Sequence, residues 1–265
     1  MTSSNTNPAT TTRSAIILAA GKGTRMKSDL PKVMHPANGR PMVEWVVDAA
    51  RTVGCAPVVL VIGHGAELVR GHFQGRGGVE FVMQMPQLGT GHAVDMARPL
   101  LERGALGEDV LVLCGDGPLI RPHTLQVLLD THRESRASAT LATAVIPDPQ
   151  GYGRIERDAH GAFRRIVEQK DATPEQLKIR EINPSYYCFR TADLFDALRR
   201  VTNQNASGEY YLTDVFELLL RDGRRVSVVD AVPPEDVLSV NTPEQLDEVS
   251  RILSSRSASS IGARA

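Results

Sequence analysis

The sequence predicts an α/β fold whose mixed, mainly parallel sheet is flanked by helices, in a Rossmann-like arrangement. Continuously apolar, strand-like runs alternate with amphipathic stretches, a pattern typical of parallel sheets covered on both faces. The 265 residues are 42% hydrophobic and 23% charged, which is typical of a globular protein with a substantial core. Ligands of such sheets bind beyond the carboxyl ends of the strands, so candidate site residues are sought there.

The first half of the chain gives a regular alternation of elements. Buried strands are expected at 16–19, 57–62, 79–83, 110–114 and 139–145. Helices are expected from Pro41 to Gly54, at 66–73, from 91 to Pro99 with a continuation past that proline, and at 121–135. The loop at 18–32 and the pair Gly115-Asp116 both follow strand ends, so they are expected at one edge of the sheet.

From about residue 147 the pattern changes to a glycine-rich turn and two short strand-like pieces. This change predicts a β-rich insertion, about 147–190, over the edge where an active site is expected. A strand at 184–190, helices near 191–201 and 212–222, a strand at 226–230 and a helix from about 243 complete a single domain at 14–253. Small polar residues predict a disordered tail at 1–13 and a frayed tail at 254–265.

Composition excludes several classes of protein. A net charge of −1 argues against a broad surface for nucleic acid or for an acidic membrane. The chain has no apolar run of about 18 residues and no apolar leader, so we expect a cytoplasmic protein. Three widely spaced cysteines form neither a disulfide framework nor a metal-binding pair.

The stretch LAAGKGTRMKSDLPK at 18–32 is a candidate phosphate-binding loop. It is not a Walker A loop, because no Gly-Lys-Ser/Thr closes it, and Met26 replaces the third glycine of a dinucleotide fingerprint. Its glycines let the backbone approach phosphate oxygens at a strand-to-helix turn, and Arg25 and Lys32 add cationic donors. The alternative is a solvated turn with incidental basic residues.

Asp116 is a candidate metal ligand. It follows an apolar strand and lies between Gly115 and Gly117-Pro118, which hold it at the ligand edge. Mg²⁺ prefers a few carboxylate oxygens together with substrate phosphates. The alternative is an aspartate that only forms a turn.

Taken together, these motifs resemble the sugar-phosphate nucleotidyltransferase superfamily, and within it the N-terminal uridyltransferase domain of the bifunctional N-acetylglucosamine-1-phosphate uridyltransferases. The resemblance covers about 14–250. Its motifs, in order, are LAAGKGTRMKSDLPKVMH, GRPMVEWVVDAA, QLGTGHA, GDGP, GYGRI, IVEQKDAT, EIN, NASGEYYLTD and VN. It implies a nucleotide-diphospho-sugar transferase fold and Mg²⁺-dependent transfer of UMP from UTP to N-acetylglucosamine 1-phosphate, with release of pyrophosphate.

The resemblance also implies roles for individual residues. The catalytic residues would be Arg25 and Lys32, which face the phosphates, and Asp116, which binds Mg²⁺ together with Asn241. The nucleotide and its uracil would contact Leu18, Ala19, Ala20, Gly21, Gln84, Gly89 and Thr90, and Gly115 would lie beside them. The sugar side would contact Gly153, Glu168 and Asn183, with Glu209, Tyr211 and Thr213 in a further sugar-side motif.

Simpler roles remain open for some of these residues. Gly153 could serve only a tight turn, Glu168 could only pair with Lys170, and Asn241 could be a turn residue beside a helix cap.

Two departures from the family pattern leave the sugar open. Pro184-Ser185 follows Asn183 where the family commonly has Thr-Gly, and Gly117 stands where Val or Thr is frequent. The alternatives are another sugar 1-phosphate or nucleotide, a non-catalytic UDP-sugar-binding protein, and, less consistent with the basic loop, a dehydrogenase. No six-residue β-helix repeat occurs, so acetyl-CoA chemistry is not expected, although a separate acetyltransferase partner stays open.

Overall fold

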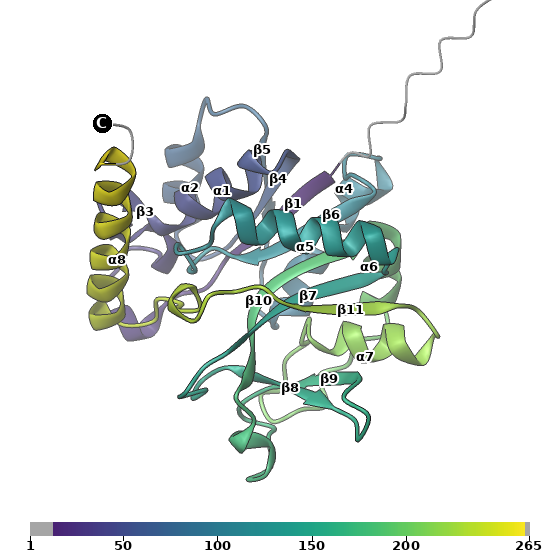
Figure 1. Ribbon diagram of the computed structural model, residues 1–265. Coiled ribbons are helices and arrows are strands. Elements are labelled where there is room, and N and C mark those ends of the chain that lie inside the picture. Colours follow the sequence, from purple (N-terminus) through teal and green to yellow (C-terminus); the bar gives the residue numbers. More distant parts are fainter. Residues whose placement is uncertain (1–12, 263–265) are drawn as a thin grey trace, which may run out of the picture.

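The computed structural model describes residues 13–262, which form an α/β domain around a nine-stranded sheet (Figure 1). The strands of this sheet are β1 (Arg13–Ala19), β4 (Cys55–Ile62), β5 (Val79–Met83), β6 (Asp109–Cys114), β7 (Ala139–Val145), β8 (Gly153–Arg157), β9 (Phe163–Val167), β10 (Glu181–Arg190) and β11 (Val226–Asp230). A two-stranded sheet consists of β2 (Pro36–Ala37) and β3 (Arg40–Pro41). The predicted fold class is confirmed.

Helices cover both faces of this sheet. They are α1 (Met42–Thr52), α2 (Ala66–Phe73), α3 (Thr90–Asp95), α4 (Arg98–Glu102), α5 (Pro122–Ser135), α6 (Thr191–Leu198), α7 (Asp214–Arg221) and α8 (Pro243–Gly262). One apolar core lies between the sheet and α1, α2 and α5, and a second lies between the sheet and α3, α4, α6 and α7. Both faces are therefore buried, which explains why the central strands β1, β4 and β6 consist mostly of apolar residues.

The sheet order brings several strand ends to one edge. Along the main path the order is β11-β7-β10-β6-β1-β4-β5, and β1, β4, β5 and β6 run parallel. Strand β10 runs antiparallel between β6 and β7, so its first residues reach the edge where those strands end. The β8–β9 hairpin pairs with the start of β10 and extends the sheet there, below the main sheet in Figure 1. This hairpin is the β-rich insertion that the sequence predicts.

Two predicted boundaries are wrong for physical reasons. The helix expected from residue 91 past Pro99 is two helices, and Pro99 lies in the first turn of α4, because a proline fits a helix start but not its interior. Strand β10 begins at Glu181 rather than 184, and its pairing with β7 shifts register between Ile182 and Tyr186.

The chain ends also differ from the prediction. Arg13 is not part of a tail, since it opens β1 and pairs with Cys55 and Asp109; residues 1–12 lie outside the described part. Helix α8 runs through the region expected to fray from 254. The Arg256 guanidinium donates to the buried carboxylate of Asp236, and Val249 and Leu253 pack in a third apolar cluster.

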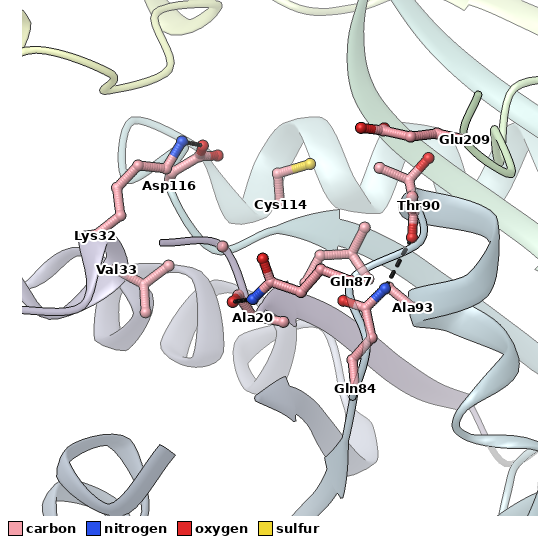
Figure 2. Close-up of a pocket in the computed structure, with 13 residues that line it drawn as sticks. Ala20, Lys32, Val33, Gln84, Gln87, Thr90, Ala93, Cys114, Asp116 and Glu209 are labelled. Atoms are coloured by element: carbon pink, nitrogen blue, oxygen red, sulfur yellow. Dashed lines mark hydrogen bonds and ion pairs between the residues drawn. The ribbon is translucent and has the colours of Figure 1, made fainter. Parts of the chain in front are cut away.

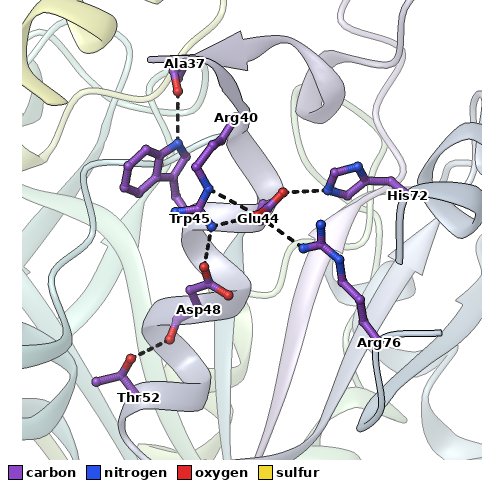
Figure 3. A network of polar contacts seen from close by, with 8 residues as sticks. All are labelled: Ala37, Arg40, Glu44, Trp45, Asp48, Thr52, His72 and Arg76. Carbon is purple, nitrogen blue, oxygen red and sulfur yellow. Dashed lines mark hydrogen bonds and ion pairs between the residues drawn. The ribbon is translucent and has the colours of Figure 1, made fainter. Parts of the chain in front are cut away.

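A polar network ties α1 to the end of α2 (Figure 3). The Glu44 side chain, 12% exposed, contacts Arg40, His72 at 2.6 Å and Arg76 at 3.2 Å. Burial alone raises the pKa of Glu44, but the hydrogen bonds from these three side chains lower it to about 2. The carboxylate is therefore ionised at neutral pH and holds the two helices together.

Candidate active site

The phosphate-like loop after β1 is shaped by one close approach. Two short 3-10 turns follow the strand, Thr24–Met26 and Lys32–Met34. Gly23 has φ of 62°, and a Cβ there would lie 2.6 Å from the Cβ of Lys32. Gly23 thus lets Lys32 pack across the loop.

The loop is not the strand-to-helix turn that the sequence predicts. The β2–β3 hairpin separates it from α1, so no α-helix begins directly after it. Anion binding here would rest on loop N–H groups and cationic side chains, without a contribution from a helix dipole.

Four of the predicted residues meet in one cluster. The Lys32 ammonium forms an ion pair with Asp116 and donates to Oδ1 of Asn241 at 3.0 Å. Arg25 donates to the same Oδ1 at 2.9 Å. Asn241 is far from the other three residues in sequence. A backbone hydrogen bond holds its segment at the cluster, because the N–H of Val240 donates to the carbonyl of Asp116 at 3.0 Å. The cluster is partly open, since Lys32 and Asp116 are 16% and 17% exposed.

The donor set of this cluster fits a divalent cation. Asp116 and Asn241 direct one carboxylate oxygen and one amide oxygen at the same cationic group, the Lys32 ammonium. Mg²⁺ takes such oxygens and usually few of them from protein. Across residues 13–262 no group of three or more His, Cys, Asp or Glu side chains is placed to hold a metal, so phosphate or water oxygens would complete the shell.

A cavity of about 320 Å³ lies beside the loop at the carboxyl ends of β1, β5 and β6 (Figure 2). The predicted residues that line it are Leu18, Ala20, Gly21, Lys32, Gln84, Gly89, Thr90 and Asp116. Val33, Gln87, Ala93, Cys114 and Glu209 complete the wall. Glu209 was expected on the sugar side but lies here.

The polar groups of this cavity are partly committed to the protein. Gln84 Nε2 donates to the Gly89 carbonyl at 2.9 Å and lies 3.2 Å from His92 Nδ1, so its amide cannot also donate freely to a base. The Thr90 hydroxyl accepts from the Leu212 N–H at 3.0 Å. Gln84 therefore keeps its amide oxygen, and Thr90 keeps its hydroxyl proton, for contacts with a ligand.

A second cavity of about 550 Å³ opens on the other side of Asp116. Its predicted members are Arg25, Asp116, Gly153, Glu168, Asn183 and Asn241. The remaining members were not predicted as site residues, although the sequence marked Pro184-Ser185 as a departure from the family pattern. They are Cys114, Gln150, Gly151, Tyr152, Pro184, Ser185, Ser239 and Gln245. Asp116 and Cys114 line both cavities, so the two spaces meet at the end of β6.

Glu168 and Asn183 are held by internal hydrogen bonds. The Thr213 hydroxyl donates to Glu168 at 2.9 Å, and Lys170 instead donates to Ser207, so the simple Glu168–Lys170 pair is not formed. Burial raises the pKa of Glu168, although the Thr213 hydrogen bond opposes this. Asn183 donates to the Tyr187 hydroxyl at 2.7 Å, which fixes the orientation of its amide.

Four predicted residues do not line either cavity, namely Ala19, Gly115, Tyr211 and Thr213. The Ala19 side chain lies in the core, and Gly115 donates its N–H to the Leu18 carbonyl at 2.9 Å, which ties the ends of β1 and β6 together. Among the residues that were missed, Gln87 and Tyr152 lie inside motifs already recognised. Gln245 could have been found from its position in a helix-capping sequence, whereas nothing in the sequence signals Ser239.

Comparison with known proteins decides the family. Residues 15–217 match the model of the MobA-like NTP transferase domain. The chain belongs to this family. This family agrees with the resemblance of the sequence to the nucleotidyltransferases, so that resemblance is confirmed.

Two relatives of this MobA-like NTP transferase are bifunctional GlmU proteins. The bifunctional protein GlmU of Geobacter metallireducens is 51% identical over 242 residues, which are 91% of this chain and 50% of that protein. GlmU of Pelobacter propionicus is 49% identical over 242 residues, which are 91% of this chain and 52% of that protein. The chain spans about half the length of the curated relatives it matches.

Solved structures support the fold. A UDP-glucose pyrophosphorylase complexed with UDP-glucose superposes with a TM-score of 0.74 at 18% identity, covering 92% of this chain and 99% of that one. Its apo form gives a TM-score of 0.72 at 19% identity, with the same coverage. From Arg13 to Gly262, every helix of this MobA-like NTP transferase is too short or too polar to cross a bilayer.

Proposed function

We propose that this protein transfers UMP from UTP to N-acetylglucosamine 1-phosphate, which gives UDP-N-acetylglucosamine and pyrophosphate. The observation that carries the proposal is the meeting of two cavities at one cationic and acidic cluster. A nucleotide in the first cavity and a sugar phosphate in the second would bring their phosphates together at Asp116, Lys32 and Asn241. The similarity of this chain to the GlmU proteins supports the uridyltransferase resemblance from which these substrates are taken.

The reaction needs no side-chain nucleophile. A phosphate oxygen of the sugar 1-phosphate attacks the α-phosphorus of UTP, a new P–O bond forms, and the bond to pyrophosphate breaks. Catalysis then rests on alignment and on neutralising charge, which preorganised donors do well. Cys114 lies at the junction, but burial raises the pKa of its thiol to about 12, which disfavours the thiolate at neutral pH.

Arg25 and Lys32 are assigned to the phosphates. Both side chains already point at the junction, where they contact Asn241, and Lys32 also pairs with Asp116. In the proposed complex their charges stabilise the departing pyrophosphate. Asp116 and Asn241 would hold Mg²⁺, which supplies further charge neutralisation when bound.

The sugar is assigned to the second cavity. Gly153 is buried beside Ile166 and Glu168. A Cβ added at Gly153 would lie 3.0 Å from Cγ2 of Ile166 and 3.6 Å from Oε2 of Glu168. A larger residue would therefore intrude into the wall, so Gly153 does more than form a turn. Glu168 and Asn183, with orientations fixed by Thr213 and Tyr187, would recognise sugar hydroxyls or the N-acetyl group.

Asp116→Asn tests this function. The substitution keeps the shape of the side chain but removes the charge that pairs with Lys32 and would bind the metal. We expect the variant to stay folded and kcat for pyrophosphate release to fall by about 10²–10³ or more, measured with UTP and N-acetylglucosamine 1-phosphate.

Asp247→Asn is the matched control, because it removes the same charge from the exposed surface of α8 and should keep full activity. Wild-type rates in Asp116→Asn would contradict the assignment. Binding of UDP-N-acetylglucosamine by the native protein without turnover of any substrate would instead indicate a UDP-sugar-binding protein.

A further inference from the structure

The pentapeptide Thr-Pro-Glu-Gln-Leu occurs twice in this chain, at 173–177 and at 242–246. Each copy forms a capping box, in which the threonine hydroxyl accepts from the glutamine N–H and the glutamine oxygen accepts from the threonine N–H. In the first copy these distances are 3.3 and 2.9 Å, and in the second they are 3.4 and 3.2 Å. The two boxes therefore share the same pair of reciprocal hydrogen bonds, the first before a short 3-10 helix and the second at the start of α8.

In the second box alone, the glutamine oxygen also accepts from the residue before the threonine. The backbone N–H of Asn241 donates to Oε1 of Gln245 at 2.7 Å, the shortest contact of this box. One side-chain oxygen thus accepts from two successive backbone N–H groups, those of Asn241 and Thr242. Gln245 fixes the direction of the chain immediately before α8.

The side chain of Asn241 depends on that direction. Its Oδ1 accepts from Arg25 and Lys32, and its Nδ2 donates to the Ser239 carbonyl at 3.3 Å. Rotation of the peptide at Asn241 would move this oxygen out of the cluster. Gln245 itself lines the second cavity, as Asn241 does.

We propose that Gln245 is a positioning residue, which holds the Asn241 side chain at the junction of the two cavities. Helix α8 provides the rigid support, because Val249 and Leu253 are buried in the third apolar cluster and Arg256 binds Asp236. The effect on catalysis rests on the proposed function, whereas the effect on the geometry of Asn241 does not.

The chemistry of the side chain sets the variants. Gln245→Leu and Gln245→Ala remove the acceptor oxygen, whereas Gln245→Glu keeps it. Gln176→Leu is the matched control, because it removes the acceptor of the threonine N–H from the identical pentapeptide, outside both cavities, together with the hydrogen bond from Gln176 Nε2 to Glu156 at 3.0 Å. Both glutamines are half-buried and each leucine variant removes two side-chain hydrogen bonds, so the two changes are comparable.

The test combines kinetics with crystal structures of the variants. Partners that orient a metal-binding side chain typically contribute 10–100-fold in affinity or activity. We therefore expect Gln245→Leu and Gln245→Ala to lower kcat/KM by about 10- to 100-fold and to need more Mg²⁺ for half-maximal rate. Gln245→Glu should restore most of the rate, and Gln176→Leu should keep wild-type kinetics. In the crystal, Asn241 Oδ1 should leave hydrogen-bond distance of Lys32 only in the variants without the acceptor.

Wild-type kcat/KM and an unmoved Asn241 in Gln245→Leu and Gln245→Ala would overturn the proposal. So would equal losses in Gln245→Leu and Gln176→Leu, because these would indicate a purely structural cap. If the native protein releases no pyrophosphate from any substrate pair, the proposed function fails instead, and the position of Asn241 in the variant crystals alone decides the role of Gln245.

Discussion

Gly89 has a backbone conformation that other residues rarely adopt. Its φ is 113°, and an added Cβ would lie 2.6 Å from the carbonyl oxygen of Tyr210. The same glycine carbonyl accepts from Gln84, so its backbone shapes the first cavity. The resemblance implied that Gly89 contacts the nucleotide, whereas the structure gives the physical reason for a glycine at this position.

We expect Gly89→Ala to lower the free energy of unfolding by more than about 2 kcal/mol, since it combines a strained φ with a backbone clash. Chemical denaturation measures the change. Gly77→Ala is the control, because Gly77 lacks a positive φ and has no atom within 4 Å of an added Cβ. Equal stabilities of the two variants would show that the loop relaxes freely around residue 89.

Ser185 shows what a departure from the family pattern does. It has φ of 66° at the position where the resemblance leads one to expect glycine, and its N–H donates to the Asn183 side chain at 3.1 Å. This local hydrogen bond offsets part of the strain of a left-handed serine. The serine lines the second cavity, so the departure from the family pattern lies in the wall of that cavity.

At the scale of elements, the Glu44 network gives a test of how α1 is held. The folded-state pKa of Glu44, about 2, lies below the ordinary 4.5. A lowered pKa stabilises the fold above about pH 4.5, and the stabilisation is lost as the pH falls towards 2.

Glu44→Gln should therefore lower the free energy of unfolding by roughly 1–3 kcal/mol at pH 7, and the difference from wild type should shrink below about pH 4.5. Urea denaturation across this pH range measures it. Glu67→Gln on α2, whose side chain is 89% exposed, should change little. A pH-independent difference for Glu44→Gln would contradict the ionic origin.

The order and type of most elements could be predicted from the sequence, because apolar strands and amphipathic helices carry their own periodicity. The break at Pro99 and the β2–β3 hairpin could not be predicted in this way. The first depends on whether a proline starts or ends a helix, and the second is two residues per strand, too short for any period. The helix from about 243 was predicted, but its continuation past 253 was not, because its polar end is held by the contacts of Arg256 with distant parts of the chain.

For the molecule as a whole, residue chemistry indicated Asp116 and the basic loop, but Asn241 came only from the resemblance. Its place depends on the return of the chain to β6 through Val240, a contact between residues far apart in sequence. The division into two cavities that share Asp116 likewise arises from the topology of the sheet, with the insertion after β7 forming the wall of the second. No local pattern encodes such a meeting point.

The central claim is that the two cavities receive UTP and N-acetylglucosamine 1-phosphate. A coupled assay for pyrophosphate release, run with UTP, CTP and dTTP against a panel of sugar 1-phosphates in the presence and absence of Mg²⁺, tests it most directly. We expect the highest kcat/KM for UTP with N-acetylglucosamine 1-phosphate, and no release of pyrophosphate without a divalent cation. Higher kcat/KM with another sugar 1-phosphate or nucleotide, or no release with any pair, would contradict it.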